Sequence, residues 1–458
     1  MGESAIIIYN VAVVNRGRVR SGAVVVDDGR IAAVDYGTDG VPARDLLAVY
    51  PGAAAVDGGG AYLMPGVIDT HVHFREPGLT DKADMVTESA AAVAGGVTSY
   101  IDMPNTIPQT TTIGRWEEKM SLAAGRSKAN YAFFLGVSSV NVGELLAADY
   151  TRVAGIKLFL GSTTGDMMVS DSALIERLLA DAPCTIVVHA ESEKVIQENM
   201  QRLNPDGLAD LPVELHSRLR SSQACYESSR SIVGLARKHD ALLHIAHVST
   251  AAELPLFTSG PVLGKRVTAE TCPQYLLLSD EDWATKGARM KCNPAVKSTA
   301  DRDALREALR AGLIDTIATD HAPHLLADKE GGALKAKSGM PMVQFSLVKM
   351  LDLFDDPALV AEKMCHNPSR LFGIEERGFV DVGMRADLVL VSRRDMPHVI
   401  TDGDVVSKCG WTPLAGTATD HEVKATLVNG HVVYSVMDGL DAESDTVGEP
   451  LRFSPGRR

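Results

Sequence analysis

The stretch GVIDTHVHF at residues 66–74 has the pattern of a buried β-strand that ends in two histidines. Seven more apolar runs follow it, with helical stretches such as DMVTESAAAVAGG and DRDALREALRAG between them. The other predicted strands are VTSYIDMPN (97–105), YAFFLGV (131–137), GIKLFLG (155–161), TIVVHAE (185–191), LLHIAHVS (242–249), VTAETCP (267–273) and DTIATDH (315–321). Eight alternations of strand and helix over about 300 residues predict an α/β fold, a (β/α)8 TIM-like barrel over residues 64–372.

Both ends of the chain differ from this middle. Residues 1–63 and 373–458 contain short predicted strands separated by turns, for example AIIIYNVAVVN and EVKATLVNGHVVYSV. Such strands would expose unpaired edges unless they paired with each other. We therefore predict one small β-sandwich domain built from both termini.

Composition limits the kinds of partner. The chain has 458 residues and a formal net charge of -14, which argues against nucleic acid and anionic membranes as partners. No stretch approaches the roughly 18–20 apolar residues of a membrane span, and the N-terminus has the pattern of a strand, not of a signal peptide. The six cysteines form no CxxC pair, which favours reduced thiols in a cytoplasmic protein. We expect a small-molecule substrate; the oligomeric state stays open, with a homodimer as one expectation.

Polar side chains recur at strand ends, where the active sites of such barrels lie. These residues are His71, His73, Lys157, His189, His247 and Asp320. Any one histidine could be a hydrogen-bonded barrel residue, as we expect for His244, which faces the helices, and for His321. Four histidines together with a lysine and an aspartate instead indicate a divalent metal that activates water, zinc being the first candidate.

Lys157 needs its own explanation, because it lies inside an apolar strand. A charged, unpaired ammonium there would cost several kcal/mol. Burial and nearby metal cations would both favour the neutral amine, which can add carbon dioxide to give a carbamate able to bridge two cations. A salt bridge from Lys157 to Asp320 or Glu191 is the alternative.

Five motifs, in order along nearly the whole chain, resemble those of the cyclic amidohydrolases of the amidohydrolase superfamily. They are HVHFREPG (71–78), DMPNT (102–106), IKLFLGSTTGDM (156–167), HVST (247–250) and DHAPH (320–324). The resemblance implies two Zn²⁺ ions per subunit, bridged by N6-carboxylated Lys157. In that arrangement the more buried ion is bound by His71, His73 and Asp320, and the second by His189 and His247. A hydroxide between the ions would be the nucleophile, and Asp320 would pass its proton to the leaving nitrogen.

This metal core is shared by dihydroorotases, allantoinases, hydantoinases and dihydropyrimidinases, so other residues must select the substrate. Arg75, Asn105 and His324 resemble the residues that hold the ring carboxylate in dihydroorotases, an anion suited to a bidentate arginine. The resemblance therefore implies dihydroorotate and carbamoyl aspartate as the substrate pair, in pyrimidine synthesis. Asn293 in CNPAVKS resembles a contact to the substrate ring, and Pro341 in SGMPM resembles part of a backbone-contact loop.

Several alternatives stay open. Arg75 could instead form a surface ion pair with Glu76 or Asp84, and Asn293 could be a turn-former before Pro294. The chain could act on allantoin or hydantoin, or it could be a non-catalytic assembly partner of a pyrimidine enzyme, although such relatives would be expected to have lost metal ligands. Two further features are Gln274 in CPQYLLL, where many relatives have histidine, and the stretch 328–340, a candidate lid.

Overall fold

The computed structural model describes residues 5–37, 43–161, 167–440 and 447–454. Parallel strands form its central barrel: β6 (Val67–Val72), β7 (Val97–Asp102), β8 (Asn130–Phe133), β9 (Leu135–Gly136), β10 (Ile156–Phe159), β11 (Ile186–His189), β12 (Leu243–Ile245), β13 (Val267–Thr271) and β14 (Thr316–Ile317). They pair in the orders β6-β7-β8 and β9-β10-β11-β12-β13-β14, and β9 follows β8 after a single residue. A parallel bridge between Val72 and His321 joins β6 to the segment after β14. The eight predicted strands are thus present in order, and the fold is an α/β barrel of the TIM type.

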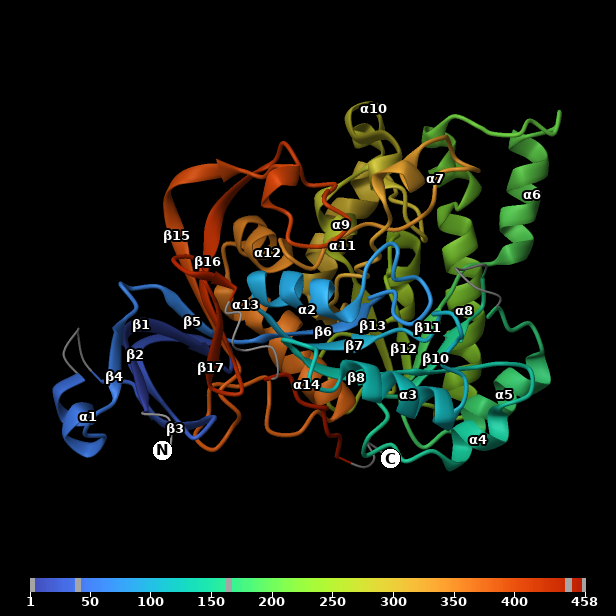
Figure 1. The fold of residues 1–458 in the computed structure, drawn as a ribbon. Helices are drawn as coiled ribbons and strands as arrows, with labels where there is room; N and C mark the ends of the chain where they lie inside the picture. The colour runs from blue at the N-terminus through green and yellow to red at the C-terminus, as the bar shows by residue number, and fades with distance from the viewer. Residues whose placement is uncertain (1–4, 38–42, 162–166, 441–446, 455–458) are drawn as a thin grey trace.

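Helices surround the barrel (Figure 1). They are α2 (Met85–Ala94), α3 (Ile113–Ala123), α4 (Val142–Ala147), α5 (Ser172–Asp181), α6 (Glu193–Leu203), α7 (His216–Leu219), α8 (Ser222–Lys238), α9 (Pro273–Leu277), α10 (Trp283–Lys286), α11 (Thr299–Arg310), α12 (Ser346–Phe354), α13 (Pro357–Ala361) and α14 (Asn367–Phe372). Side-chain caps fix where several begin: Asp84 accepts from the Thr87 N–H before α2, and Ser298 accepts from the Asp301 N–H before α11.

Strands from the two ends of the chain form one nine-stranded sheet. Its members are β1 (Ile6–Asn15), β2 (Arg18–Asp27), β3 (Arg30–Asp35), β4 (Ala54–Asp57), β5 (Tyr62–Pro65), β15 (Leu388–Val399), β16 (Ala418–Val428), β17 (His431–Ser435) and β18 (Gly439–Leu440), with helix α1 (Ala43–Val49) between β3 and β4. The antiparallel pair β5-β15, with Leu63 opposite Leu390, joins the two ends. Figure 1 shows the blue and red strands side by side at the left. The ends therefore pair as expected; the two-layer sandwich and its domain bounds stay predictions.

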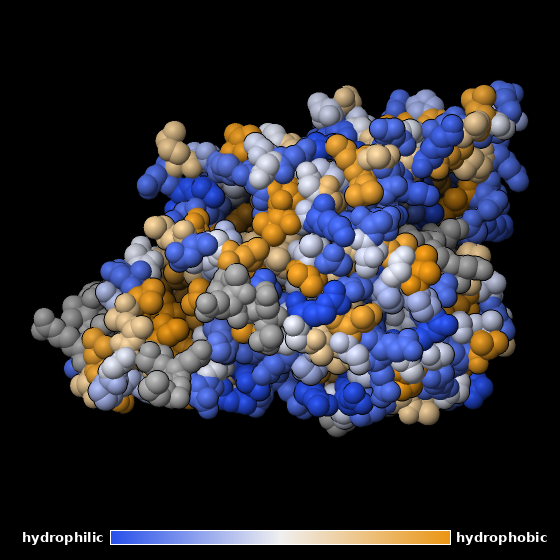
Figure 2. Space-filling view, viewed as in Figure 1, coloured by the Kyte–Doolittle hydropathy of each residue, from blue (hydrophilic) through white to orange (hydrophobic). Residues whose placement is uncertain are grey.

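The terminal sheet has its own small core beside the barrel core. Side chains such as Ile8, Val24 and Leu388 pack together on one side of it, while Met64 and Val389 belong to the large core that includes the barrel. Figure 2 shows a group of hydrophobic residues on the left, over the terminal strands, and others scattered among hydrophilic residues across the rest of this face. None of the helices in the described ranges is long and apolar enough to cross a membrane.

Candidate active site

The ends of β6 and β14 bring three predicted metal ligands together. Nε2 of His73 lies 3.0 Å from Oδ1 of Asp320, and Nε2 of His71 lies 3.4 Å from the same oxygen. The ligand atoms of all three lie within 4.8 Å of one another, and the three side chains are almost entirely shielded from solvent. Two imidazoles and a carboxylate that converge in a buried site suit a divalent metal, so these residues fit the metal that the sequence predicts.

A second pair of histidines lies beside this group. His189 at the end of β11 and His247 just after β12 approach to 2.8 Å between Nδ1 and Nε2. The rings of His247 and His71 have centroids 5.4 Å apart, so the two groups adjoin. Burial lowers the pKa of His247 well below its usual value, and His189 and Lys157 lower it further. A neutral imidazole presents a lone pair, which is the form that binds a metal.

Buried carboxylates hold the other ring nitrogens of two of these histidines. Nδ1 of His71 lies 2.7 Å from Glu270, and Nε2 of His189 lies 3.1 Å from Glu191. Metal-ligating histidines typically donate their second ring N–H to a carboxylate, which fixes the tautomer. Burial alone would raise the pKa of Glu191, but Arg220 and His189 outweigh it and lower that pKa to about 2. These contacts leave Nε2 of His71 and Nδ1 of His189 to face a metal.

Lys157 lies on β10 and lines the same cavity. It is 1% exposed, and none of the described residues offers its Nζ a hydrogen-bond partner. Burial lowers the pKa of this amine to about 8. The alternative salt bridges to Asp320 and Glu191 are not formed among the described ion pairs. A buried amine left without a partner calls for a further group at this place, and a carbamate with bound cations would satisfy it.

Protonation and backbone geometry both favour a functional role at the strand ends. Burial lowers the pKa of His73 to about 4, so this imidazole is neutral near pH 7. Burial would raise the pKa of Asp320, but His71 and His73 outweigh it and lower that pKa, which keeps the carboxylate ionised. Asp320, His247 and Arg75 also have left-handed backbones, with φ of 48°, 41° and 68°. Such conformations cost about 1–3 kcal/mol each and cluster at functional sites.

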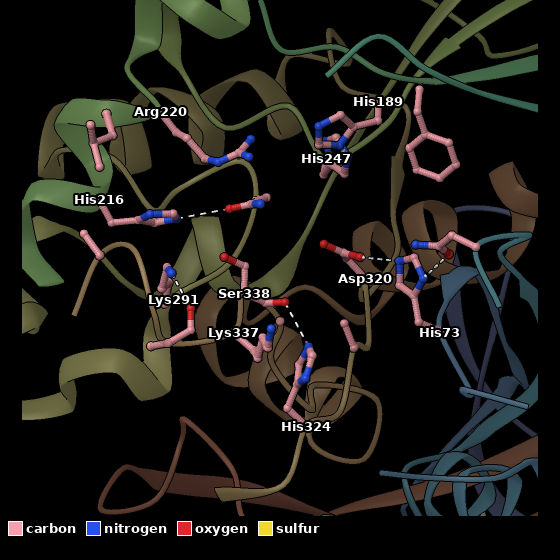
Figure 3. Close-up of a pocket in the computed structure, with 18 of the residues that line it drawn as sticks. His73, His189, His216, Arg220, His247, Lys291, Asp320, His324, Lys337 and Ser338 are labelled. Carbon is pink, nitrogen blue, oxygen red and sulfur yellow. Dashed lines mark hydrogen bonds and ion pairs between the residues drawn. The ribbon is translucent and has the colours of Figure 1, made fainter. Parts of the chain in front are cut away.

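A cavity of about 400 Å³ opens beside the strand-end residues. Figure 3 shows His73 and Asp320 on one side of it and His216, Arg220 and Lys291 on the opposite side. Among the described residues of its lining, and leaving Lys157 aside, five cationic side chains face a single carboxylate, that of Asp320. The five are Arg75, Arg220, Lys291, Lys335 and Lys337. Since the chain as a whole carries a net charge of -14, this local excess of positive charge suits an anionic ligand.

Arg75 lies in this cavity and not at the surface. It is 3% exposed, and its Nε donates to the Pro323 carbonyl oxygen at 2.9 Å. The alternative ion pair with Glu76 or Asp84 is wrong, because Glu76 pairs instead with Arg126 at 2.8 Å and Asp84 with Lys408. Burial lowers the pKa of Arg75 to about 10, so the guanidinium stays charged at pH 7.

The other two predicted carboxylate-binding residues line the same cavity. Oδ1 of Asn105 lies 2.8 Å from Nδ1 of His73, and accepting that N–H leaves the amide NH₂ group for the cavity. Nδ1 of His324 can accept from Lys82 at 3.2 Å, while its Nε2–H donates to the Ser338 carbonyl oxygen at 3.0 Å. One neutral tautomer satisfies both contacts, and in it the Nε2–H cannot also accept from Nη2 of Arg75, which lies 3.1 Å away.

Of the two remaining predicted substrate contacts, one lines the cavity and the other does not. Asn293 lines the cavity, and its Oδ1 accepts from Nε2 of His216 at 3.1 Å. Pro341 does not line it; Ser338 and Gly339 do. Gln274 lies fully buried in α9 and outside this lining. The STTGD part of the fourth-strand motif, 162–166, falls outside the described residues.

Two histidines that were expected to be structural are so. Nδ1 of His244 lies 2.8 Å from Oγ1 of Thr268, and Nε2 of His321 lies 2.7 Å from Glu88. Neither histidine lines the cavity.

Comparison with known proteins agrees with this geometry. The chain matches the amidohydrolase family over residues 62–433. A dihydroorotase of Methanosarcina acetivorans is 31% identical, covering 95% of this chain and 93% of the relative. An allantoinase of Bacillus velezensis is 30% identical, covering 98% of each chain. Among solved structures, the L-hydantoinase (dihydropyrimidinase) of Arthrobacter aurescens superposes with a TM-score of 0.85 at 26% identity, covering 100% of this chain and 98% of that one.

A TIM-type barrel with imidazoles and a carboxylate converging at its strand ends defines a hydrolase with a group of residues suited to a metal. The family match spans most of the chain, so the chain belongs to the amidohydrolase family.

Proposed function

We propose that this amidohydrolase is a dihydroorotase, which reversibly hydrolyses the cyclic amide of dihydroorotate to N-carbamoyl-aspartate in pyrimidine synthesis. The observation that carries the proposal is the buried Arg75 guanidinium, which lines the same cavity as the predicted metal ligands. Dihydroorotate carries a ring carboxylate, whereas hydantoin and dihydrouracil carry none. A buried, charged arginine in a cationic cavity suits that anion and has no counterpart on the neutral rings.

The metal site proposed here holds two zinc ions. His71, His73 and Asp320 would hold one ion, and His189 and His247 the other. Lys157, carboxylated on Nζ, would be shared between them, which the lack of any hydrogen-bond partner for this buried amine supports. When bound, the ions would polarise the amide carbonyl and lower the pKa of a water molecule enough to make it a nucleophile.

The chain's own residues would divide the remaining work. Asp320 is ionised and faces the cavity, so its carboxylate can take the proton of the attacking water and return it to the leaving ring nitrogen. Arg75, the Asn105 amide and His324 would hold the ring carboxylate and thereby fix the ring against the metal ligands. Asn293 would contact the ring from the opposite wall.

Allantoin and hydantoin are the competing substrates, because relatives named for their hydrolysis are similarly close. The test measures kcat/KM for dihydroorotate, allantoin and hydantoin on one preparation of known metal content. We expect dihydroorotate to exceed both by at least about 30-fold, the lower end of what a desolvated charge pair contributes. A higher value for either neutral ring would overturn the proposal. Turnover of none of them would favour a non-catalytic assembly role. The presence of all six predicted metal ligands argues against that role.

We also propose that residues 1–63 and 373–458 form a β-sandwich domain, with the barrel over residues 64–372. The separate small core supports this, because it joins side chains of β1, β2 and β3 to side chains of β15 and β16. A cytoplasmic enzyme is proposed on the six scattered cysteines; a homodimer remains an expectation.

A further inference from the structure

The segment 328–340 borders the cavity, and its residues 332–334 are bound to the loop that follows α6. Residues 333–339 of it line the cavity. The Asp210 carboxylate accepts the backbone N–H groups of Gly332 at 2.6 Å and Leu334 at 2.9 Å. These bonds hold the segment over the site.

A buried ammonium group adds to the backbone hydrogen bonds of residues 337–339, in which the Lys337 N–H donates to Asp328 at 2.8 Å and the Gly339 N–H to Lys291 at 2.9 Å. Lys329 is 5% exposed. Its Nζ donates to the carbonyl oxygens of Lys337 at 2.7 Å, Gly339 at 2.8 Å and Lys291 at 3.0 Å. A lysine ammonium has three donors, so in its charged form the group uses all three on the backbone. We call this arrangement, Lys329 Nζ with its three carbonyl oxygens, the lysine clasp.

The lysine clasp binds the backbone on both sides of Ser338, at the carbonyl oxygens of Lys337 and Gly339. The Ser338 carbonyl oxygen accepts from Nε2 of His324 at 3.0 Å. Gly339 lies so close that a Cβ there would meet Cδ2 of His324 at 2.9 Å and the Ala322 carbonyl oxygen at 2.6 Å. The loop backbone is therefore fitted against the imidazole, and a shift of the loop would move that ring.

His324 in turn adjoins the proposed anion-binding arginine, since Nη2 of Arg75 lies 3.1 Å from its Nε2. Burying an ammonium without a carboxylate partner is unfavourable, and burial lowers the pKa of Lys329 to about 7. An apolar side chain would fill the same space without that penalty. We therefore look for the role of Lys329 in the loop backbone that its hydrogen bonds position.

We propose that Lys329 is a positioning residue for substrate specificity. It holds the Ser338 carbonyl on His324, and this keeps that ring in place beside Arg75, the proposed donor to the carboxylate of the substrate. The inference rests on the proposed function, because it concerns the same carboxylate.

The test compares Lys329→Met with Lys363→Met. Lys363 is a matched control, because it is 3% exposed and its Nζ also donates to a backbone carbonyl, that of Ile314 at 3.1 Å, before β14 and away from the strand ends that carry the site. The measurements are kcat and KM for dihydroorotate and for the neutral dihydrouracil, and the Kd of orotate, a planar analogue with the same carboxylate. We expect Lys329→Met to raise KM for dihydroorotate and Kd for orotate by at least about tenfold, the order of one misplaced hydrogen bond. KM for dihydrouracil should change less than about twofold, and Lys363→Met should change none of these values.

Wild-type affinity for orotate in Lys329→Met, or a parallel loss on both substrates, would overturn the positioning role. If Lys329→Met does not fold, Gly339→Ala disturbs the same contact from the other side and should give the same selective loss. Failure of the proposed function has a different signature, because the wild-type protein itself would then neither turn over dihydroorotate nor bind orotate.

Discussion

Replacing Arg75 by methionine removes the guanidinium while keeping most of the side-chain volume. Arg75 is 3% exposed and remains charged at neutral pH, because burial lowers its pKa only to about 10. Loss of one partner of a desolvated charge pair costs about 2–5 kcal/mol. That range predicts a fall in kcat/KM for dihydroorotate of about 30-fold to several thousand-fold. Dihydrouracil, which has no carboxylate, should lose far less.

The assay follows ring opening of both substrates by wild type, Arg75→Met and Arg126→Met. Arg126 is the control, because it lies close by in an ion pair with Glu76 but its side chain is 39% exposed; its replacement should leave the ratio of the two substrates unchanged. Equal losses on dihydroorotate and dihydrouracil in Arg75→Met would refute the reasoning, since a disturbed metal site or fold depresses both alike.

Three further changes test other parts of the account. Lys157→Ala should abolish most turnover, and added short carboxylic acids should restore part of it by replacing the bridge; an active, metal-loaded protein with unmodified Lys157 would contradict this. Asp320→Asn should lower kcat by at least about 10²-fold, and a near-normal kcat would assign the proton transfer elsewhere. Burial raises the pKa of Glu253 from 4.5 to about 7, so the stability that this group contributes is present below pH about 4.5 and is lost as pH rises towards 7, by about 3 kcal/mol. Glu253→Gln should therefore raise Tm over wild type more near pH 8 than near pH 5; an equal effect at both would contradict the assignment.

The barrel could be predicted from the sequence because each of its strands is marked by a short, local sequence pattern. Buried parallel strands need continuous apolar runs, and each of the eight predicted runs contains an observed strand. Pairing of the two chain ends could also be predicted, since unpaired edges are unfavourable, and β5-β15 provides it. Closure of the terminal sheet into two layers stays a prediction, since it would depend on twist and long-range packing, which no short stretch encodes.

The sequence pattern by itself predicted the site where its residues lie on or at the ends of strands, whereas Asn293 was expected only from the resemblance to cyclic amidohydrolases. His71, His73 and Asp320 converge because the barrel places strand ends together. Glu270 was missed, although a carboxylate inside the apolar strand VTAETCP is the same signal that singled out Lys157.

Residues on the opposite wall of the cavity gave no such signal. His216 and Arg220 come from α7 and the residue after it, between β11 and α8, and Lys291 follows a short helical turn. Their places depend on how long loops fold back over the barrel. In the sequence, Lys329 is only one charged residue in a polar loop. Its three carbonyl partners are brought to it by the fold.

The central claim is that this cavity opens dihydroorotate with bound metal, and a zinc titration of the chelated protein tests it most directly. Metal content per chain and the rate of dihydroorotate ring opening are measured on the same samples. The account predicts no turnover in the metal-free protein and a rate that rises until two zinc ions are bound per chain. Full turnover in rigorously metal-free protein would contradict it.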